Sequence, residues 1–225
     1  PIGGRMSKDK SGDIWVCTEG GGLNRLHDGE FTTYKHQNGN STTLGANTLK
    51  SIYYHPGNNH LYIGTHLGGM YVFDCGTGKG HSLHHVEGDA TSLPHEIVND
   101  IQPYKDGLAV LTQGGPAFFN LQTEKFSPIV DDVKLQLEWE YSFETFFIDN
   151  KQRAWLAYSA GGLLCVDFVN KTAKRYSSSS SNPSAIGKFK IVKIFQSSRG
   201  DIYFCTIGSG LFKYIEADNS FKAYN

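Results

Sequence analysis

The hydrophobic positions of the chain recur as short alternating runs separated by glycine-rich turns. Residues 12–26 read GDIWVCTEGGGLNRL, in which an apolar run ends at Thr18, three glycines follow and a second apolar run begins. Residues 200–214 read GDIYFCTIGSGLFKY, which is the same arrangement. Short runs rich in β-branched and aromatic residues and bounded by glycine predict β-hairpins.

The same stretch recurs at an almost constant interval. The positions aligned with Thr18 are Thr65, Thr112, Tyr158 and Thr206, so the steps along the chain are 47, 47, 46 and 48 residues. Each repeat holds four strand-like runs, and we find no convincing helical period. Repeats of about 40–50 residues that consist of short strands indicate the blades of a β-propeller.

We therefore predict an all-β chain, a β-propeller of four-stranded antiparallel blades with about five blades present. The single predicted propeller covers residues 1–225, with blades at approximately 1–37, 47–87, 95–130, 142–177 and 187–225. The chain begins at Pro1 without an initiator methionine, and we identify no exchange of a terminal strand that would close a ring. We expect an arc cut from a larger propeller.

Composition narrows the function classes. The 21 Lys and Arg residues balance 22 Asp and Glu residues without a basic stripe, which argues against nucleic acid as a partner. No apolar run reaches the roughly 18–20 residues of a membrane span. The four cysteines form no CxxC pair. Cys17 and Cys205 precede the repeated threonine, where a small buried residue is favoured over a redox pair.

The repeated pattern D-x-x-G-x-aliphatic-W-aliphatic-x-T-x3-G-L resembles the two-component regulator propeller repeat. The match is clearest at 9–23 (DKSGDIWVCTEGGGL) and good at 198–211 (SRGDIYFCTIGSGL). The unit at 106–120 departs most, with Ala109 in place of the tryptophan and Pro116-Ala117 in place of Gly-Leu. The resemblance covers nearly the whole chain.

This resemblance implies the extracytoplasmic, periplasmic sensor region of a bacterial hybrid two-component histidine kinase. It implies an oligosaccharide as the stimulus and a phosphorelay carried out by the parent protein, so that the chain itself is no enzyme and holds no cofactor. The implied partners are the remaining propeller blades and a dimer partner of the parent receptor, with membrane contact only through the parent protein. Two alternatives stay open: a propeller-fold glycan-active hydrolase or lyase, and a structural protein-interaction propeller.

The residue after the repeated threonine varies while its frame repeats. Glu19, His66 and Gln113 occupy this position in the first three repeats. Variable tips on a fixed scaffold are typical of binding sites, so these polar side chains are candidate oligosaccharide ligands. The alternative is that they are solvated turn residues.

A second candidate site lies at 134–143 (KLQLEWEYSF), where aromatic and carboxylate residues alternate. Trp139 with Glu138 suits stacking on a sugar and hydrogen bonding to its hydroxyls, whereas the alternative is a first strand that starts early and fills the core with its aromatics. If this segment is a strand, we expect Glu138 and Glu140 on one face with Cα atoms about 6.5–7 Å apart, a parallel arrangement that disfavours a glycosidase pair.

The segment HSLHH, residues 81–85, contains three histidines that suggest a metal site. His84 and His85 are adjacent, and on a strand their side chains point to opposite faces. We therefore predict exposed histidines on an outer strand and no metal site.

Overall fold

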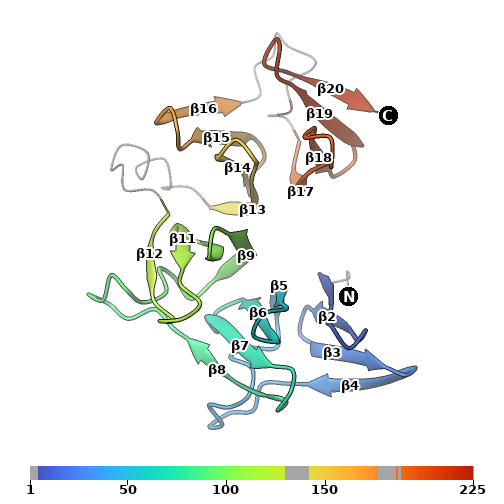
Figure 1. Cartoon of the computed structure of the whole chain (residues 1–225), viewed down its shortest axis with the longest axis vertical. Helices are drawn as coiled ribbons and strands as arrows, with labels where there is room; N and C mark the ends of the chain where they lie inside the picture. The colour runs from blue at the N-terminus through green and yellow to red at the C-terminus, as the bar shows by residue number, and fades with distance from the viewer. Residues whose placement is uncertain (1–4, 130–141, 177–185, 187–188, 225) are drawn as a thin grey trace. The chain divides into compact units, whose positions relative to one another are not determined.

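The structure, a computed structural model, describes residues 5–129, 142–176, 186 and 189–224. These residues form twenty β-strands in five four-stranded sheets, and no α-helix occurs among them. Consecutive strands of each sheet pair antiparallel, so every sheet is a meander (Figure 1). The predicted all-β class and the four-stranded antiparallel blades of a β-propeller are confirmed.

The strands follow chain order in every sheet. The first sheet consists of β1 (Met6–Lys8), β2 (Ile14–Thr18), β3 (Gly22–His27) and β4 (Glu30–Tyr34). The second consists of β5 (Leu49–His55), β6 (His60–Thr65), β7 (Met70–Asp74) and β8 (Lys79–Leu83). The third consists of β9 (Val98–Tyr104), β10 (Gly107–Thr112), β11 (Gly115–Phe119) and β12 (Phe126–Pro128). The fourth consists of β13 (Phe143–Ile148), β14 (Arg153–Tyr158), β15 (Leu163–Asp167) and β16 (Thr172–Tyr176). The fifth consists of β17 (Ile191–Gln196), β18 (Ile202–Thr206), β19 (Leu211–Ile215) and β20 (Ser220–Tyr224).

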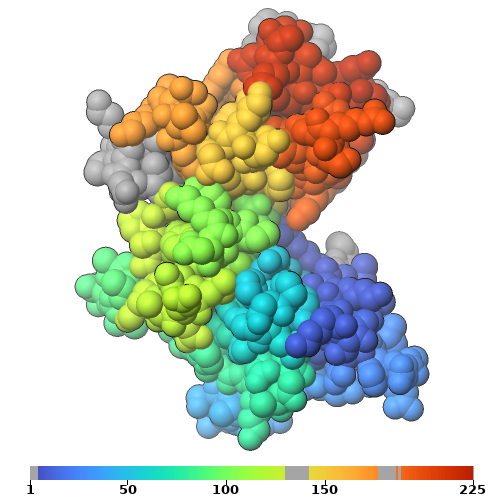
Figure 2. All heavy atoms as spheres, in the orientation of Figure 1, coloured from blue at the N-terminus to red at the C-terminus, as the bar shows by residue number. Residues whose placement is uncertain are grey.

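The chain divides into two compact units, residues 1–129 and 130–225, and each is described by itself. In the first unit the innermost strands of neighbouring sheets contact each other, β1 with β5 and β5 with β9. The first three sheets therefore lie side by side (Figure 2). In the second unit β13 contacts β17 in the same way.

The aromatic residues of the second strands pack between neighbouring sheets. Trp15 is buried, and its ring lies 5.2 Å from that of Phe73 in the second sheet. Trp155 is likewise buried, with its ring 5.5 Å from that of Phe204 in the fifth sheet. Burial of such large rings is a main source of hydrophobic stabilisation, which explains why four of the five repeats have an aromatic residue at this position.

A buried aspartate organises the turn that precedes the second strand. Asp9 Oδ1 accepts hydrogen bonds from the backbone N–H groups of Ser11 and Asp13, at 2.8 and 3.1 Å. Its Oδ2 accepts a hydrogen bond from the indole Nε1 of Trp15, at 2.8 Å. In the fourth sheet Asp149 makes the same three bonds, each 2.9 Å long, to Lys151, Arg153 and Trp155. One side chain thus fixes both the turn and the packed ring.

Two of the connections between sheets each contain one buried leucine. Leu44 and Leu93, which lie inside polar stretches of the sequence, are buried in the hydrophobic core. The backbone carbonyl oxygen of Leu44 lies 2.5 Å from His36 Nδ1, and the carbonyl oxygen of Leu93 lies 2.8 Å from His85 Nδ1. These connections are therefore anchored loops, because each one inserts a leucine side chain between sheets.

The expectation for the histidines near the end of the second sheet is partly wrong. Strand β8 ends at Leu83, so His84 and His85 lie beyond it and do not follow strand alternation. His84 Nδ1 lies 3.1 Å from Glu96 Oε2, and His81 Nε2 lies 2.9 Å from Glu124 Oε2. These side chains connect the second sheet to the third.

The four cysteines are free thiols. Burial raises the pKa of Cys17 to about 12, and it does the same for Cys165. A thiol with such a pKa carries almost no thiolate at neutral pH and is unreactive. Cys17 therefore acts as a small buried residue beside the repeated threonine.

Candidate functional site

The candidate site is the edge of the first unit where second strands turn into third strands. We call it the loop edge: it consists of the turns at 18–22, 65–70 and 112–115 together with the connections 35–48 and 84–97 that enter the next sheet. All of these segments belong to the first unit.

The repeated threonine closes each turn through its hydroxyl group. Thr18 Oγ1 donates to the carbonyl oxygen of Gly22, Thr65 Oγ1 to that of Gly69, and Thr112 Oγ1 to that of Gly115, all at 2.8 Å. The residue whose carbonyl oxygen closes this turn has a positive φ in several repeats, including Gly22 at 79° and Gly69 at 70°, which explains the recurrent glycine. The turns at the loop edge therefore share one backbone frame.

Backbone hydrogen bonds tie each turn to the neighbouring connection. The N–H groups of Gly20 and Gly22 both donate to the carbonyl oxygen of Asn47, at 3.1 and 3.0 Å. One sheet later, the N–H of Gly69 donates to the carbonyl oxygen of Glu96 at 3.0 Å. Because these bonds join one sheet to the segment that enters the next, they restrain the loop edge as a rigid surface.

The structure places three of the predicted site residues at equivalent positions on this surface. Glu19, His66 and Gln113 each follow the threonine of their turn, and all three are exposed. The N–H of His66 donates to Thr48 O at 2.9 Å and that of Gln113 to Ile97 O at 3.1 Å, so backbone bonds hold both residues in place. The other two predicted residues, Glu138 and Trp139, lie outside the residues that the structure describes.

Part of the segment that contains Glu138 and Trp139 can be followed. Phe143 is the first residue of β13, is fully buried, and stacks on Tyr158 with ring centroids 4.8 Å apart. The aromatic residue at the end of this segment therefore fills the core of the second unit.

The sequence did not reveal Leu67, which is next to His66 at the tip of its turn. Its side chain is 66% exposed, and its backbone is left-handed, with φ at 65°. A bulky residue in this conformation costs of order 1 kcal/mol or more. No local sequence pattern indicates this strain. The sequence therefore did not predict that an exposed apolar side chain, Leu67, lies next to the polar His66.

Glu96 is a second residue that the sequence analysis missed. Its Oε1 accepts a hydrogen bond from the N–H of His85 at 2.8 Å, while its Oε2 pairs with His84. Asn47 occupies the same place one sheet earlier, where its Oδ1 accepts the N–H of His36 at 2.8 Å. These side chains fix the connections at the loop edge.

A partly buried ion pair joins Arg5, which precedes β1, to Asp100 in β9. Arg5 Nη1 bonds Asp100 Oδ1, and the side chain of Asp100 is only 3% exposed. The two residues are 95 positions apart in the sequence, so periodicity gave no signal for the pair. The backbone carbonyl of Arg5 also accepts the N–H of Cys17, at 3.0 Å, close to the first turn of the loop edge.

The loop edge offers hydrogen-bonding groups on a fixed backbone. It combines a carboxylate, an imidazole and a carboxamide, which can accept and donate hydrogen bonds to hydroxyl groups. Among the described residues, no cluster of three or more His, Cys, Asp or Glu side chains could hold a metal ion. The geometry suits recognition of a polar ligand.

Comparisons with known proteins give fold relatives only. No model of a protein family matches the sequence, and no curated protein matches it. Within the described residues, no helix is long and apolar enough to cross a membrane.

Several solved structures match the fold over the whole chain. The extracellular domain of BT3049 from B. thetaiotaomicron, described as a hybrid two-component system, superposes with a TM-score of 0.81 at 21% identity, over 99% of this chain and 30% of that one. The extracellular domain of BT4673 from the same organism, also described as a hybrid two-component system, gives a TM-score of 0.69 at 19% identity, with the same coverage of both chains.

PorZ, a component of the type-IX secretion system of Porphyromonas gingivalis, gives a TM-score of 0.64 at 14% identity over 99% of this chain and 33% of its own. This chain thus spans about a third of the length of these proteins. The comparisons establish that it shares its β-propeller fold with extracellular domains of two-component systems.

Proposed function

We propose that this chain is the ligand-recognising part of an extracytoplasmic, periplasmic sensor of a hybrid two-component system, and that its loop edge binds an oligosaccharide. The main support is that three adjoining sheets have equivalent threonine-closed turns, each with a different exposed polar residue: Glu19, His66 and Gln113. Structural similarity to the extracellular domains of two-component systems supports the sensor assignment.

In this proposal the chain binds its ligand without turning it over, and the parent protein transmits the signal. A single propeller would include the five sheets together with further blades of the parent, and receptor dimerisation would also belong to the parent. Phosphorelay chemistry and attachment to the membrane would reside there as well.

The test is calorimetry of the 225-residue chain against a panel of oligosaccharides. A variant with Glu19→Ala, His66→Ala and Gln113→Ala is compared with a matched variant carrying Lys10→Ala, Lys79→Ala and Asp106→Ala, three exposed residues at the opposite edge of the same sheets. We expect the first variant to lose binding by about tenfold or more, as for loss of several hydrogen bonds, and the second to retain it.

Two results would contradict the proposal. Equal affinity in both variants would exclude the loop edge as the binding surface. Release of new reducing ends or of unsaturated sugars from the same panel would favour the alternative of a glycan-active enzyme.

A further inference from the structure

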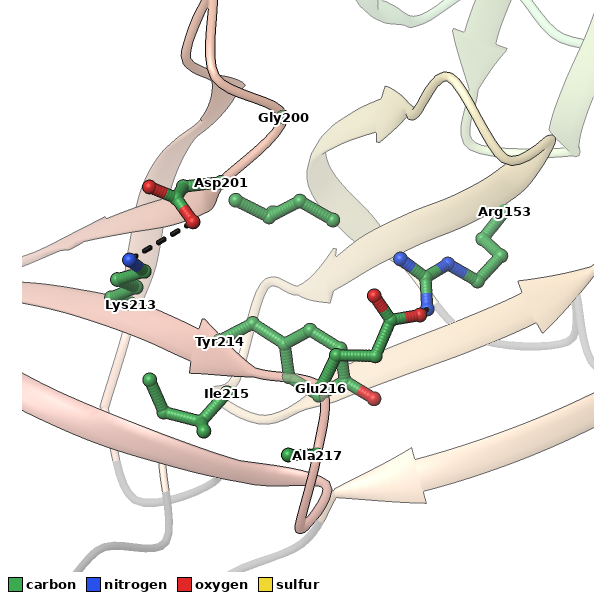
Figure 3. A pocket seen from close by; sticks show the side chains of 9 residues that line it. Arg153, Gly200, Asp201, Lys213, Tyr214, Ile215, Glu216 and Ala217 are labelled. Carbon is green, nitrogen blue, oxygen red and sulfur yellow. Dashed lines mark hydrogen bonds and ion pairs between the residues drawn. The ribbon is translucent and has the colours of Figure 1, made fainter.

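A cavity of about 250 Å³ lies in the second unit, at the edge opposite the threonine-closed turns. Its walls come from the start of β14, the turn before β18, and the end of β19 with the turn that follows. Four charged side chains and one aromatic ring line it: Arg153, Asp201, Lys213, Glu216 and Tyr214 (Figure 3).

One wall is a guanidinium group fixed from several sides. The side chain of Arg153 is 12% exposed, and its Nε donates to Asp149 Oδ2 at 2.7 Å. Its Nη1 donates to Glu216 Oε1 at 2.9 Å, and its charge lies over the rings of Trp155 and Tyr214 at 5.3 and 5.5 Å. Such a pre-organised donor loses little freedom when a ligand arrives.

The opposite wall is a second ion pair. Lys213 Nζ lies 2.9 Å from Asp201 Oδ1, and Figure 3 shows the ring of Tyr214 in the space between this pair and Arg153. Lys151 Nζ adds a second cation to Glu216, at 2.6 Å. Both carboxylates of the cavity are thus neutralised by cations.

This charge balance selects the chemistry of the ligand. A carboxylate offers about four lone-pair sites and an ammonium group three N–H donors, so each pair retains capacity for further hydrogen bonds. Neutral hydroxyl groups can use that capacity without separating an ion pair. A charged ligand would find no excess of opposite charge, and would have to displace an existing partner.

Size and the aromatic ring restrict the ligand further. Pockets for drug-sized molecules measure about 300–1,000 Å³, so this cavity suits something smaller. The exposed part of the Tyr214 ring, together with the side chain of Ile215, can contact the C–H groups of a saturated ring while the hydroxyls of that ring reach the charged walls.

We propose that this cavity binds one neutral polyhydroxyl ring, the size of a single sugar unit. The site is separate from the loop edge and would remain if the loop edge bound nothing. Asp201, Glu216 and Arg153 would hold the hydroxyls, with Tyr214 as the apolar platform.

The test is saturation-transfer NMR of the 225-residue chain with a panel of free neutral aldohexoses and aldopentoses. We expect at least one sugar to bind, and Asp201→Ala to weaken it about tenfold, as for loss of one hydrogen bond to a charged group. Asp218→Ala is the matched control, because this exposed carboxylate lies one residue beyond the cavity lining and should leave binding unchanged.

Folding and specificity are controlled separately. If Asp201→Ala unfolds, Lys213→Gln tests the same wall of the cavity and should also weaken binding of the sugar. The variant of Glu19, His66 and Gln113 should bind the monosaccharide as the unmodified chain does, which separates the two sites. Failure of every sugar to bind, equal weakening by Asp218→Ala, or displacement of the sugar by acetate or glycine at equal concentration would overturn the proposal.

Discussion

The indole Nε1 of Trp15 donates a 2.8 Å hydrogen bond to Oδ2 of Asp9, a carboxylate that also bonds the backbone of the turn between β1 and β2. Both side chains are buried. The ring that packs against the second sheet and the turn that begins β2 therefore depend on one carboxylate. The same relationship between Trp155 and Asp149 in the fourth sheet makes it a repeated property of the fold.

Asp9→Ala is expected to destabilise the first unit by about 2–4 kcal/mol, because it leaves three donors without an acceptor in a buried place. Urea unfolding followed by tryptophan fluorescence measures this change. Asp106→Ala, an exposed turn aspartate of the same unit, is the control and should change stability by less than about 0.5 kcal/mol. A loss in Asp9→Ala no larger than in the control would mean that the hydrogen bonds to Asp9 contribute little.

Thr65→Val should cost about 1–3 kcal/mol, since it keeps the shape of the side chain but removes the hydroxyl that closes the turn. The hydroxyl of Thr65 is fully buried, donates to Gly69 O and accepts the N–H of Gly68 at 2.9 Å. Thr18→Val removes the equivalent bond from a partly exposed residue and should cost less. Chemical denaturation of both variants ranks them, and the reverse order would contradict the account of the turn.

Gly64→Ala is expected to loosen the packing of the second sheet on the third. A Cβ at this position would lie 2.3 Å from Ser51 Oγ and 2.7 Å from the backbone oxygen of Val98. Since the backbone oxygen can move only with β9, we expect a loss of about 1–3 kcal/mol. Gly76→Ala is the control, because its backbone is not left-handed and a Cβ there would come no closer than 3.2 Å to another atom, the side-chain Oδ1 of Asp74. Thermal melting should place Gly64→Ala clearly below Gly76→Ala.

The stability of the first unit should depend on pH through Asp13 and His27. Their Oδ1 and Nδ1 atoms lie 2.5 Å apart, and Asp13 is buried while His27 is half-exposed. The hydrogen bond from His27, with help from Arg25, lowers the pKa of Asp13, and the hydrogen bond to Asp13 raises the pKa of His27.

The two shifts define a pH window. The contribution of His27 is fully present below the ordinary histidine pKa of about 6.5 and is lost as pH rises through its raised folded value. The contribution of Asp13 is present above the ordinary aspartate pKa of about 3.9 and is lost as pH falls through its lowered folded value. When the pH rises from about 6 to about 9, the free energy of unfolding should fall more for the unmodified chain than for the His27→Gln variant. Identical pH profiles, or an NMR titration of His27 below about pH 6.5, would contradict the pairing.

The period of the repeated pattern was enough to predict the five sheets, because four of the five turns use a threonine hydroxyl and the fourth repeat, with Tyr158, keeps the glycines and the same interval. The same period places an aromatic residue in the second strand of four repeats, at Trp15, Tyr62, Trp155 and Tyr203. The bond from Trp15 to Asp9 could not be predicted from the pattern, since a bond to a ring six residues later depends on how β2 leaves the turn.

Other features depend on contacts between sheets and leave little trace in a local pattern. Leu44 and Leu93 are single apolar residues in polar loops, so the sequence pattern around them does not predict that they are buried. Arg5 and Asp100 meet because the first and third sheets belong to one unit. The cavity beside Arg153 combines residues of two sheets, none of which stands out in its own repeat.

The most direct test of the central claim is a residue-resolved NMR titration of the chain with the tightest-binding oligosaccharide of the panel. The account predicts that amide shifts concentrate at Glu19, His66 and Gln113 and at the neighbouring turns, with little change in the turns at the opposite edge of the same three sheets. Shifts confined to that opposite edge, or none at saturating oligosaccharide, would contradict the assignment of the loop edge as the recognition surface.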